Sequence, residues 1–464
     1  MATVPSISPR VLPTSGSDMD AEPITDQFTN ILSFLNEASN FDEGNVDLTS
    51  SDGLVGKSTT QTIAGNKTFS GTTAFTGVVT GITSYFDATV AAGGGGNYST
   101  IQAADDALDA APGYRLRVIG SQTYAETFTV STNDNLIYID ALTVITSLVL
   151  SGHRNTVILG ASCQLTGDIT LSGNHNKVVF DPLANLDGHV TLSGTANELH
   201  CGVGANLATS KTLLLSGANS KAIFGAEAAI VGVISMTADD AYCEVGNQSV
   251  VTTSITLETG TGQIFKAGNE VTSTGAIVVS GADAECHFGS TANLDDNVTI
   301  SGAGVKASFG NTLNLATTKT LLLSGANASC IVGAQAAIPG ILSMTADDTY
   351  LEIGSQSVIT GATGLITGTG QILKLGNEVT LTGDVTVSAA DAELHMGSTA
   401  NLDGNFTISG VGAKVTLGTT ANLATTKTLL MSGANASCII GAQFACLGII
   451  SLTGADTEIE VGNG

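Results

Sequence analysis

The chain has 464 residues, of which only 12% are charged, and its formal net charge is −26 because Lys and Arg are few. A basic patch that could displace counterions from phosphates or bind an anionic membrane surface is missing, so we expect no nucleic-acid partner and no membrane insertion. No stretch approaches the roughly 20 apolar residues of a membrane span, and residues 1–10 lack the apolar core of a signal peptide.

Residues 1–50 are interpreted as an attachment and oligomerisation segment. Residues 1–22 are rich in Pro and Ser and are expected to be extended or ordered by a partner. A short amphipathic helix is predicted over 25–38, because apolar residues recur there at spacings of three and four. These residues are Phe28, Ile31, Leu32 and Leu35. We expect this helix to meet its copies in an oligomer or to dock on a larger assembly; the alternative is a cap helix that folds onto its own chain.

Residues 51–96 form a short fibre-repeat region that ends in a flexible joint, the glycine run Gly93–Gly96. The phrase Gln61–Phe69 reads Gln-Thr-Ile-Ala-Gly-Asn-Lys-Thr-Phe. It resembles a phrase found in the shafts of bacteriophage tail fibres and related virion appendages. A phosphate-loop interpretation of Gly56–Ser58 fails, because Ser51 stands where that motif needs its first Gly.

The tail-fibre resemblance implies a structural protein of a phage virion, assembled in the host cytoplasm. It implies a homotrimer, contacts with other virion proteins of the tail or neck through the N-terminal segment, and a host-surface receptor bound through a distal part. Two alternatives stay open: a bacterial surface adhesin or surface-array solenoid, and a tailspike that depolymerises polysaccharide. The missing export signal counts against the adhesin.

Residues 97–140 contain four features in sequence. They are Tyr98–Gln102, a helical stretch over 103–110, the alternating run Arg115–Ile119 and the phrase Thr123–Glu126. This order resembles the N-terminal end of pectin-lyase-like right-handed β-helices, and it implies that the helix plugs the open end of the stack. The first full coil is then expected near 123–140. A plug is needed because the first coil otherwise exposes its core and an unpaired strand edge.

Residues 141–464 repeat at two levels. Lys211–Gly217 returns at Lys319–Gly325 and, with one Leu changed to Met, at Lys427–Gly433, so a long repeat of about 108 residues is present. Within it, a glycine that closes an apolar stretch recurs in steps of about 21 to 23 residues. Examples are Gly202, Gly225, Gly246, Gly268, Gly289 and Gly310. Each long repeat therefore holds five coils, and this pattern is typical of a solenoid.

The residues before each glycine alternate as a strand does. In Glu285–Gly289 and Lys414–Gly418 the second and fourth residues are apolar and the first and third are polar, which is the period of a strand with one buried face. A second strand is predicted at Val298–Gly302, and a third, short segment centres on Asn-Leu pairs. The fold class predicted for 141–464 is therefore all-β, a parallel β-helix with coils of about 22 residues, and the pectin-lyase-like resemblance implies that it is right-handed.

Asparagine precedes Leu in the short third segment, where we expect it to adopt a left-handed turn conformation and to bond neighbouring backbone. The residues are Asn185, Asn206, Asn293, Asn314, Asn401 and Asn422. Stacked coils would place these amides in related turns.

Seven cysteines are present, and the alternation points five of them inward. These five are Cys201, Cys243, Cys286, Cys330 and Cys438. We interpret them as small core residues with free thiols, in a protein made in a reducing cytoplasm. Because no Cys-x-x-Cys spacing is present, no metal site and no cofactor is assigned.

Ile223, Ile331 and Ile439 occupy positions where the alternation predicts solvent, and each stands one long repeat from the next. Three exposed isoleucines in one line, about 24 Å apart at about 4.8 Å per coil, are interpreted as an interface stripe. We therefore expect homotrimerisation through one edge of the shaft and through the helix at 25–38.

Carboxylates recur with the long repeat, and Asp239–Asp240 and Glu285 each have a copy at the same place in the next one. A catalytic pair in a polysaccharide-cleaving enzyme is not copied in this way, Trp is absent and aromatic residues are only 5% of the chain. We therefore predict no enzymatic activity and assign no catalytic residue. The Glu-x-His pairs that end at His287 and His395 lie five coils apart and cannot share an ion, so we interpret them as polar surface.

The given chain stops at Gly464, two residues after a coil-closing glycine, with no segment to cover the last coil. A bare terminal coil exposes its apolar core and a row of unpaired backbone groups. We expect a longer fibre or a second protein that caps this end, with the receptor-binding tip further out.

Overall fold

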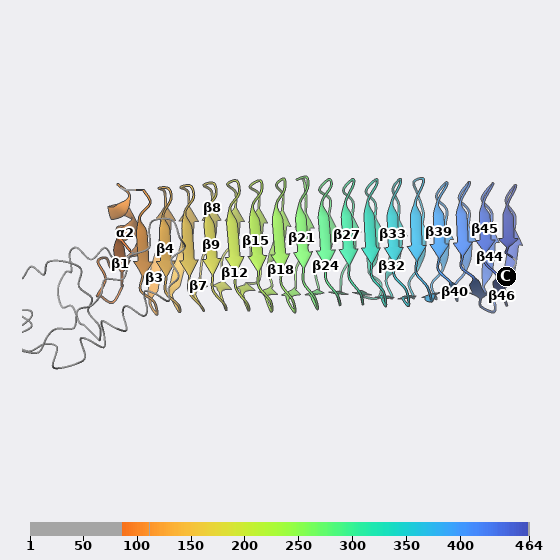
Figure 1. The fold of residues 1–464 in the computed structure, drawn as a ribbon, viewed down its shortest axis with the longest axis horizontal. Coiled ribbons are helices and arrows are strands. Elements are labelled where there is room, and N and C mark those ends of the chain that lie inside the picture. Colours follow the sequence, from red (N-terminus) through yellow and green to blue (C-terminus); the bar gives the residue numbers. More distant parts are fainter. Residues whose placement is uncertain (1–85, 111, 463–464) are drawn as a thin grey trace, which may run out of the picture. The chain divides into compact units, whose positions relative to one another are not determined.

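Three short strands joined by three turns make each coil of a parallel β-solenoid (Figure 1). The computed structural model describes residues 86–110 and 112–462. Strands pair with the strands of the neighbouring coils in parallel and in register, which confirms the predicted parallel β-helix. The helix predicted at 25–38 and the phrase Gln61–Phe69 lie outside the described residues.

Face 1 is a stack of 18 strands. These strands are β1 (Ala88–Val90), β2 (Arg115–Val118), β4 (Leu136–Ile139), β6 (Thr156–Leu159), β9 (Lys177–Phe180), β12 (Glu198–Cys201), β15 (Lys221–Phe224), β18 (Tyr242–Val245), β21 (Ile264–Ala267), β24 (Glu285–Phe288), β27 (Lys306–Phe309), β30 (Ser329–Val332), β33 (Tyr350–Ile353), β36 (Ile372–Leu375), β39 (Glu393–Met396), β42 (Lys414–Leu417), β45 (Ser437–Ile440) and β48 (Glu458–Val461). Buried and solvent-facing residues alternate along β24, β39 and β42, as the sequence predicts.

Faces 2 and 3 are joined at the first coils by two long strands, β3 (Thr123–Val130) and β5 (Val144–Leu150). Face 2 continues with β7 (Gln164–Leu165), β10 (Asn185–Leu186), β13 (Asn206–Leu207), β16 (Ala229–Ile230), β19 (Val250–Val251), β22 (Thr272–Ser273), β25 (Asn293–Leu294), β28 (Asn314–Leu315), β31 (Ala337–Ile338), β34 (Val358–Ile359), β37 (Val379–Leu381), β40 (Thr399–Leu402), β43 (Thr420–Leu423) and β46 (Gln443–Cys446). Face 3 continues with β8 (Ile169–Leu171), β11 (Val190–Leu192), β14 (Thr212–Leu215), β17 (Val233–Met236), β20 (Ile255–Leu257), β23 (Ile277–Val279), β26 (Val298–Ile300), β29 (Thr320–Leu323), β32 (Ile341–Met344), β35 (Thr363–Leu365), β38 (Val385–Val387), β41 (Phe406–Ile408), β44 (Thr428–Met431) and β47 (Ile449–Leu452).

The first full coil consists of β3 and β4, which confirms the start predicted near 123–140. Face 1 has 18 strands, and β1 and β2 precede this coil, so 16 coils follow from β4 to β48. At about 4.8 Å per coil the stack is roughly 75 Å long.

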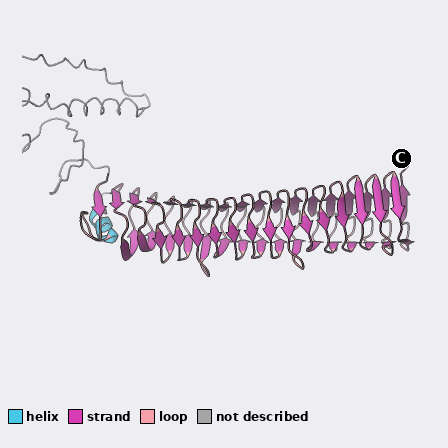
Figure 2. Ribbon diagram, turned by 90° about the horizontal axis from the view of Figure 1, so that it is seen from below, coloured by secondary structure: helices cyan, strands magenta, loops and turns pink. Residues whose placement is uncertain are grey.

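The order of coils within the long repeat is also confirmed, because the longer coils place their extra residues in the same turns. The turns from face 2 to face 3, here the 2–3 turns, are lengthened at 208–211, 316–319 and 424–427. Thr209 and Ser210 are exposed there, while β13 keeps its register with the coils on both sides. Figure 2 shows loops that project from one edge of the stack.

The core is one continuous column of inward side chains. Phe265, Phe288 and Phe309 follow one another along it, with ring centroids 5.7 Å and 5.4 Å apart. The five predicted inward cysteines are buried, as is Cys163, and Cys446 is exposed. Burial raises the pKa of the Cys286 thiol to about 12, so this thiol stays protonated and unreactive at neutral pH.

The coil-closing glycines stack on one another in the turns from face 1 to face 2. A Cβ atom on Gly418 would lie 1.6 Å from the carbonyl oxygen of Gly397 in the preceding coil. No other residue fits that approach, which explains why glycine marks the repeat.

The left-handed conformation predicted for the Asn-Leu asparagines is wrong. Asn185 and Asn206 are outward strand residues of face 2, because the Leu that follows each one must point into the core. Their side chains form a ladder, in which Asn206 Nδ2 donates to Asn185 Oδ1 over 2.9 Å. The left-handed residues lie in the turns instead, as at Asn219 with φ of 57°.

The predicted plug is present, with a shift in its bounds. Helix α2 spans Ile101–Leu108 rather than 103–110, because the Thr100 side chain accepts a hydrogen bond from the Ala103 N–H and starts the helix earlier. Ile101 is fully buried at the end of the core. The Glu126 carboxylate accepts a hydrogen bond from the Ile101 N–H over 2.6 Å, so the phrase Thr123–Glu126 fastens the plug to the first coil.

Candidate functional site

The polar chemistry of the solenoid is concentrated on the outer side of face 1. Most of the basic residues in the described part of the chain lie in face 1 strands: Arg115, Arg117, Lys177, Lys221, Lys266, Lys306, Lys374 and Lys414. Within the described strands of faces 2 and 3, from β5 onward, Asp, Glu, Lys and Arg do not occur. Any binding site that depends on charge on a strand therefore belongs to face 1.

The Glu285-x-His287 pair on face 1 is a closed cluster. His287 Nε2 lies 3.1 Å from Glu285 Oε2, and His287 Nδ1 lies 2.7 Å from the Ser308 hydroxyl. The Lys306 ammonium is 3.7 Å from Glu285 Oε1. The His287 hydrogen bond lowers the pKa of the Glu285 carboxyl. Because both ring nitrogens of His287 already have partners, the cluster offers at most two ligand atoms to an ion.

Two tyrosines on face 1 are also held in place by their neighbours. The Tyr242 hydroxyl donates to Glu244 over 2.5 Å, and the ammonium groups of Lys221 and Lys266 lie 5.0 Å and 5.6 Å from its ring centroid. In the next long repeat, the Tyr350 hydroxyl donates to Glu352 over 2.5 Å, and the Lys374 ammonium lies 5.3 Å from its ring centroid. The pattern is therefore copied with the repeat, as a structural cluster is and a single catalytic site is not.

The carboxylates at the turns from face 3 to face 1, here the 3–1 turns, cap the following coil. Asp239 Oδ1 accepts hydrogen bonds from the N–H of Thr261 over 2.8 Å and from its hydroxyl over 3.0 Å. These bonds, above all the one from the backbone N–H, lower the pKa of Asp239. Asp347 binds Thr369 in the same way one long repeat later. These acids are repeated turn caps.

A carboxylate group at the plug is the one set of three side chains, among the described residues, that could hold a metal ion. Asp105, Asp106 and Asp109 place one oxygen each within 4.8 Å of one another. Asp105 is fully buried, accepts a hydrogen bond from the Tyr114 hydroxyl and another from Gln102 Nε2 over 3.2 Å. Burial raises the pKa of Asp105 to about 6. Because Asp105 is already bonded within the plug, we assign no metal here.

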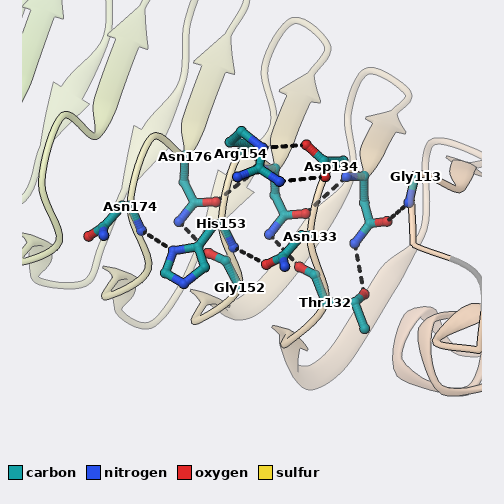
Figure 3. Close-up of polar contacts among 11 residues, drawn as sticks. Gly113, Thr132, Asn133, Asp134, Gly152, His153, Arg154, Asn174 and Asn176 are labelled. Carbon is teal, nitrogen blue, oxygen red and sulfur yellow. Dashed lines mark hydrogen bonds and ion pairs between the residues drawn. The ribbon is translucent and has the colours of Figure 1, made fainter.

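Two ladders of side chains tie the first coils together at the 3–1 turns (Figure 3). In the inner ladder, Asn155 Oδ1 accepts from the Asn135 N–H over 3.0 Å and Asn176 Oδ1 accepts from the Asn155 N–H over 2.9 Å. In the outer ladder, the His153 N–H donates to Asn133 Oδ1 over 2.7 Å. These amides are engaged in binding neighbouring coils, so the ladders stiffen the shaft rather than form a ligand site.

The sequence-predicted interface residues divide into two groups. Phe28, Ile31, Leu32 and Leu35 lie outside the described residues. Ile331 and Ile439 are 50% and 45% exposed on face 1, and Ile223 is half-buried there, so the predicted outward orientation is confirmed. The stripe is interrupted, because Ile331 pairs with Ser308 on one side and Glu352 on the other. Its role as an interface stays a prediction.

Sequence reasoning missed the other apolar residues of the same coils. The coil that contains Ile331 also presents Ala337 on face 2, Pro339 in the 2–3 turn and Ile341 on face 3 to the outside. In one coil of every five, these outward positions on face 2, in the 2–3 turn and on face 3 are all apolar. We call residues 337–341 and their copies at 229–233 and 445–449 the apolar bands. The signal was present in the sequence as the same long-repeat spacing that singled out Ile331.

Comparison with family models, curated proteins and solved structures found no match. Among the described residues, no helix combines the length and apolar character that crossing a bilayer would require. The function is therefore argued from the chain's own residues.

Proposed function

We propose that this chain is a structural fibre protein of a bacteriophage virion, a tail fibre or a similar appendage. Its N-terminal segment anchors it, and its shaft projects towards the host cell. The observation that carries the proposal is the unbroken stack of 16 coils, together with the fibre phrase Gln61–Phe69 that precedes it.

The mechanism is mechanical. Backbone hydrogen bonds between coils run along the axis of the stack, so a bending force acts on three ladders of bonds at once. The side-chain ladders of Asn135, Asn155 and Asn176 add bonds in the same direction. The buried core runs without a break from β3 to β45. A shaft of this kind holds a host-recognition surface at a fixed distance from its anchor.

The partners proposed are two further copies of the chain, forming a homotrimer, and other virion proteins bound through residues 1–50. A receptor on the host surface is proposed to bind a distal part of the fibre. A fibre outside the cell must resist proteolysis. The turns between coils are short and their backbone groups are hydrogen-bonded to the next coil, as in the bond from the Asp240 N–H to the Thr261 carbonyl, so we expect proteases to cut them slowly.

Immunogold electron microscopy tests the virion assignment. Antibodies against 141–464 are expected to label an appendage of purified virus particles from the source of the sequence, and mass spectrometry of the same particles is expected to find the chain. Label on the surface of uninfected bacteria, with none on particles, would favour the adhesin and overturn the proposal.

A depolymerisation assay separates the fibre from the tailspike. Purified protein is incubated with capsular polysaccharide or lipopolysaccharide from the host. We expect no new reducing ends to be released. Release that boiling abolishes would overturn the fibre assignment and favour the tailspike; loss of that release in Glu285→Gln or Glu393→Gln would place the activity at these carboxylates.

A further inference from the structure

The apolar bands lie on the two faces of the solenoid whose strands, from β5 onward, carry no charge; the 2–3 turns between these faces do carry charged residues, as in the ion pair of Lys319 with Asp296. Within the described strands from β5 onward, faces 2 and 3 present Thr, Ser, Asn, Gln, Ala, Leu, Val and Ile to the outside. The whole chain nevertheless has a net charge of −26. Soluble monomers normally cover exposed strands with charged side chains, so two long uncharged faces on an acidic protein indicate that these faces are covered.

The bands are the most apolar part of these faces. Ile341 is 40% exposed on face 3. On face 2, Ala337 is exposed beside Val358, which pairs with it from the next coil and is 44% exposed. Ala229 and Val250 form the same pair one long repeat earlier. Between bands the same positions are polar, as at Asn293 and Asn297. The apolar area is therefore divided into separate levels about 24 Å apart at about 4.8 Å per coil.

The partner that matches this spacing is a second copy of the chain. A band reaches from face 2 through the 2–3 turn to face 3 at one level. Face 2 of one copy therefore meets face 3 of the next with all three bands matched only when the two copies lie at the same height, because a shift by one long repeat leaves a band at each end unmatched. A closed oligomer that uses two different sides of each subunit has this arrangement. The three levels, at 229–233, 337–341 and 445–449, repeat the match along the shaft.

We propose that copies of this chain pack side by side, parallel and in register, through faces 2 and 3, and that the apolar bands set the register. This rests on the proposed function in one respect: copies anchored by their N-terminal segments at one place run in the same direction. Face 1, with its Glu, His, Lys and Tyr clusters, stays exposed on the outside of the assembly.

Two matched substitutions in one coil test which faces are covered. Ile341→Glu on face 3 and Ile331→Glu on face 1 change the same residue type at similar exposure. Light scattering of the full chain is expected to show an oligomer for the unmodified protein and for Ile331→Glu, and single chains for Ile341→Glu. Circular dichroism checks that each variant keeps its fold. If Ile341→Glu does not fold, Val358→Glu on face 2 is used in its place.

A single-chain mass for the unmodified protein overturns the proposal. Dissociation by Ile331→Glu, with the oligomer of Ile341→Glu unchanged, also overturns it and would favour the face 1 stripe instead.

Spin labels test the direction and the register of the copies, after Cys446→Ser removes the exposed thiol. Labels at Thr156 and Ser437, which lie near opposite ends of face 1, are expected to give distances between copies that are equal and much shorter than the separation of the two sites along the shaft; long distances at both sites would indicate antiparallel copies and overturn the proposal. Clearly unequal distances at the two sites, or a ladder of growing masses, would exclude the parallel, closed arrangement.

These results are independent of where the protein acts. The protein can be absent from virus particles and still assemble as described, which would overturn the virion assignment alone. A single-chain protein found in particles would overturn the assembly and the proposed homotrimer, and would leave the virion assignment standing.

Discussion

Asn176 shows how a single buried side chain holds two coils. It is fully buried; its Oδ1 accepts from the Asn155 N–H over 2.9 Å, and its Nδ2 donates to the Gly152 carbonyl over 2.8 Å. The position is filled by Asn in four successive coils and then by Ser220, Ala241 and Gln263. Some backbone N–H and carbonyl groups of the 3–1 turns have no backbone partner, and the buried side-chain amides at this position form hydrogen bonds with them instead.

Asn176→Ala is expected to destabilise the protein by about 1–3 kcal/mol, because it leaves a buried N–H and a buried carbonyl without partners. Asn206→Ala is the control, since Asn206 makes one amide bond on the outside of face 2 and its loss is expected to cost less than about 1 kcal/mol. Urea unfolding followed by circular dichroism measures both. Equal losses in the two variants would contradict the role given to the inner ladder.

Asp105 gives the plug a pH dependence. Burial raises its pKa to about 6, above the ordinary value near 3.8, so the folded plug binds a proton that the unfolded chain has already released in this range. The contribution of Asp105 to stability is then greatest below about pH 4, falls as pH rises to about 6, and stays lower above it, with a change of at most about 3 kcal/mol.

The variant Asp105→Asn is expected to remove this dependence and to be the more stable protein at pH 7, because the amide keeps an acceptor for the Tyr114 hydroxyl and cannot ionise. Thermal melting of both proteins at pH 4 and pH 8 measures the difference. If the melting temperatures of the variant and the unmodified protein differ by the same amount at both values, Asp105 does not titrate as described.

At the scale of elements, the strands could be predicted because each coil repeats one local rule. The alternation in Glu285–Gly289 identifies a face 1 strand without further context, and its copy in the next long repeat confirms its register. The Asn-Leu segment was misjudged because two residues are too few to show alternation, and Asn favours both turns and exposed strand ends. Only the inward Leu186 beside Asn185 decides between them.

The plug and the bands were predictable to different extents. Helix α2 was found from its resemblance, but its start depends on Thr100 and on Glu126, which lies in the later strand β3. To predict the apolar bands, the outward residues of all three faces of one coil must be aligned at the same level. The alternation within a single strand shows only the face to which that strand belongs. Ile331 was therefore found, and Ile341 was not.

The long 2–3 turns are expected to be separable from the coil that carries them. Removing Thr209 and Ser210 shortens their coil to the length of its shorter neighbours, while β13 and β14 keep their partners. We expect the melting temperature to change little, because both residues are exposed and a short loop costs little entropy to close. A loss of more than about 2 kcal/mol in urea unfolding would show that the loop supports the stack.

For the whole molecule, stability is expected to be a property of neighbouring coils rather than of one global core. Ile101→Asp puts a charge into the end of the core and is expected to release α2 and the first coils. Hydrogen exchange measures this coil by coil: protection over 115–139 is expected to fall, while protection over 285–309 is retained. Loss of protection along the entire stack would indicate a single cooperative unit instead.

The fixed places of the lengthened turns have a consequence for how such a shaft changes its reach. Since every fifth coil restores the same outline, a duplication or deletion of one long repeat joins strands that already fit, and each projecting loop and apolar band returns to its own edge. Growth by any other number of coils would put mismatched surfaces at the same height in neighbouring copies. The length of the shaft is therefore quantised: recombination between the similar long repeats changes it in increments of about 24 Å, five coils at a time.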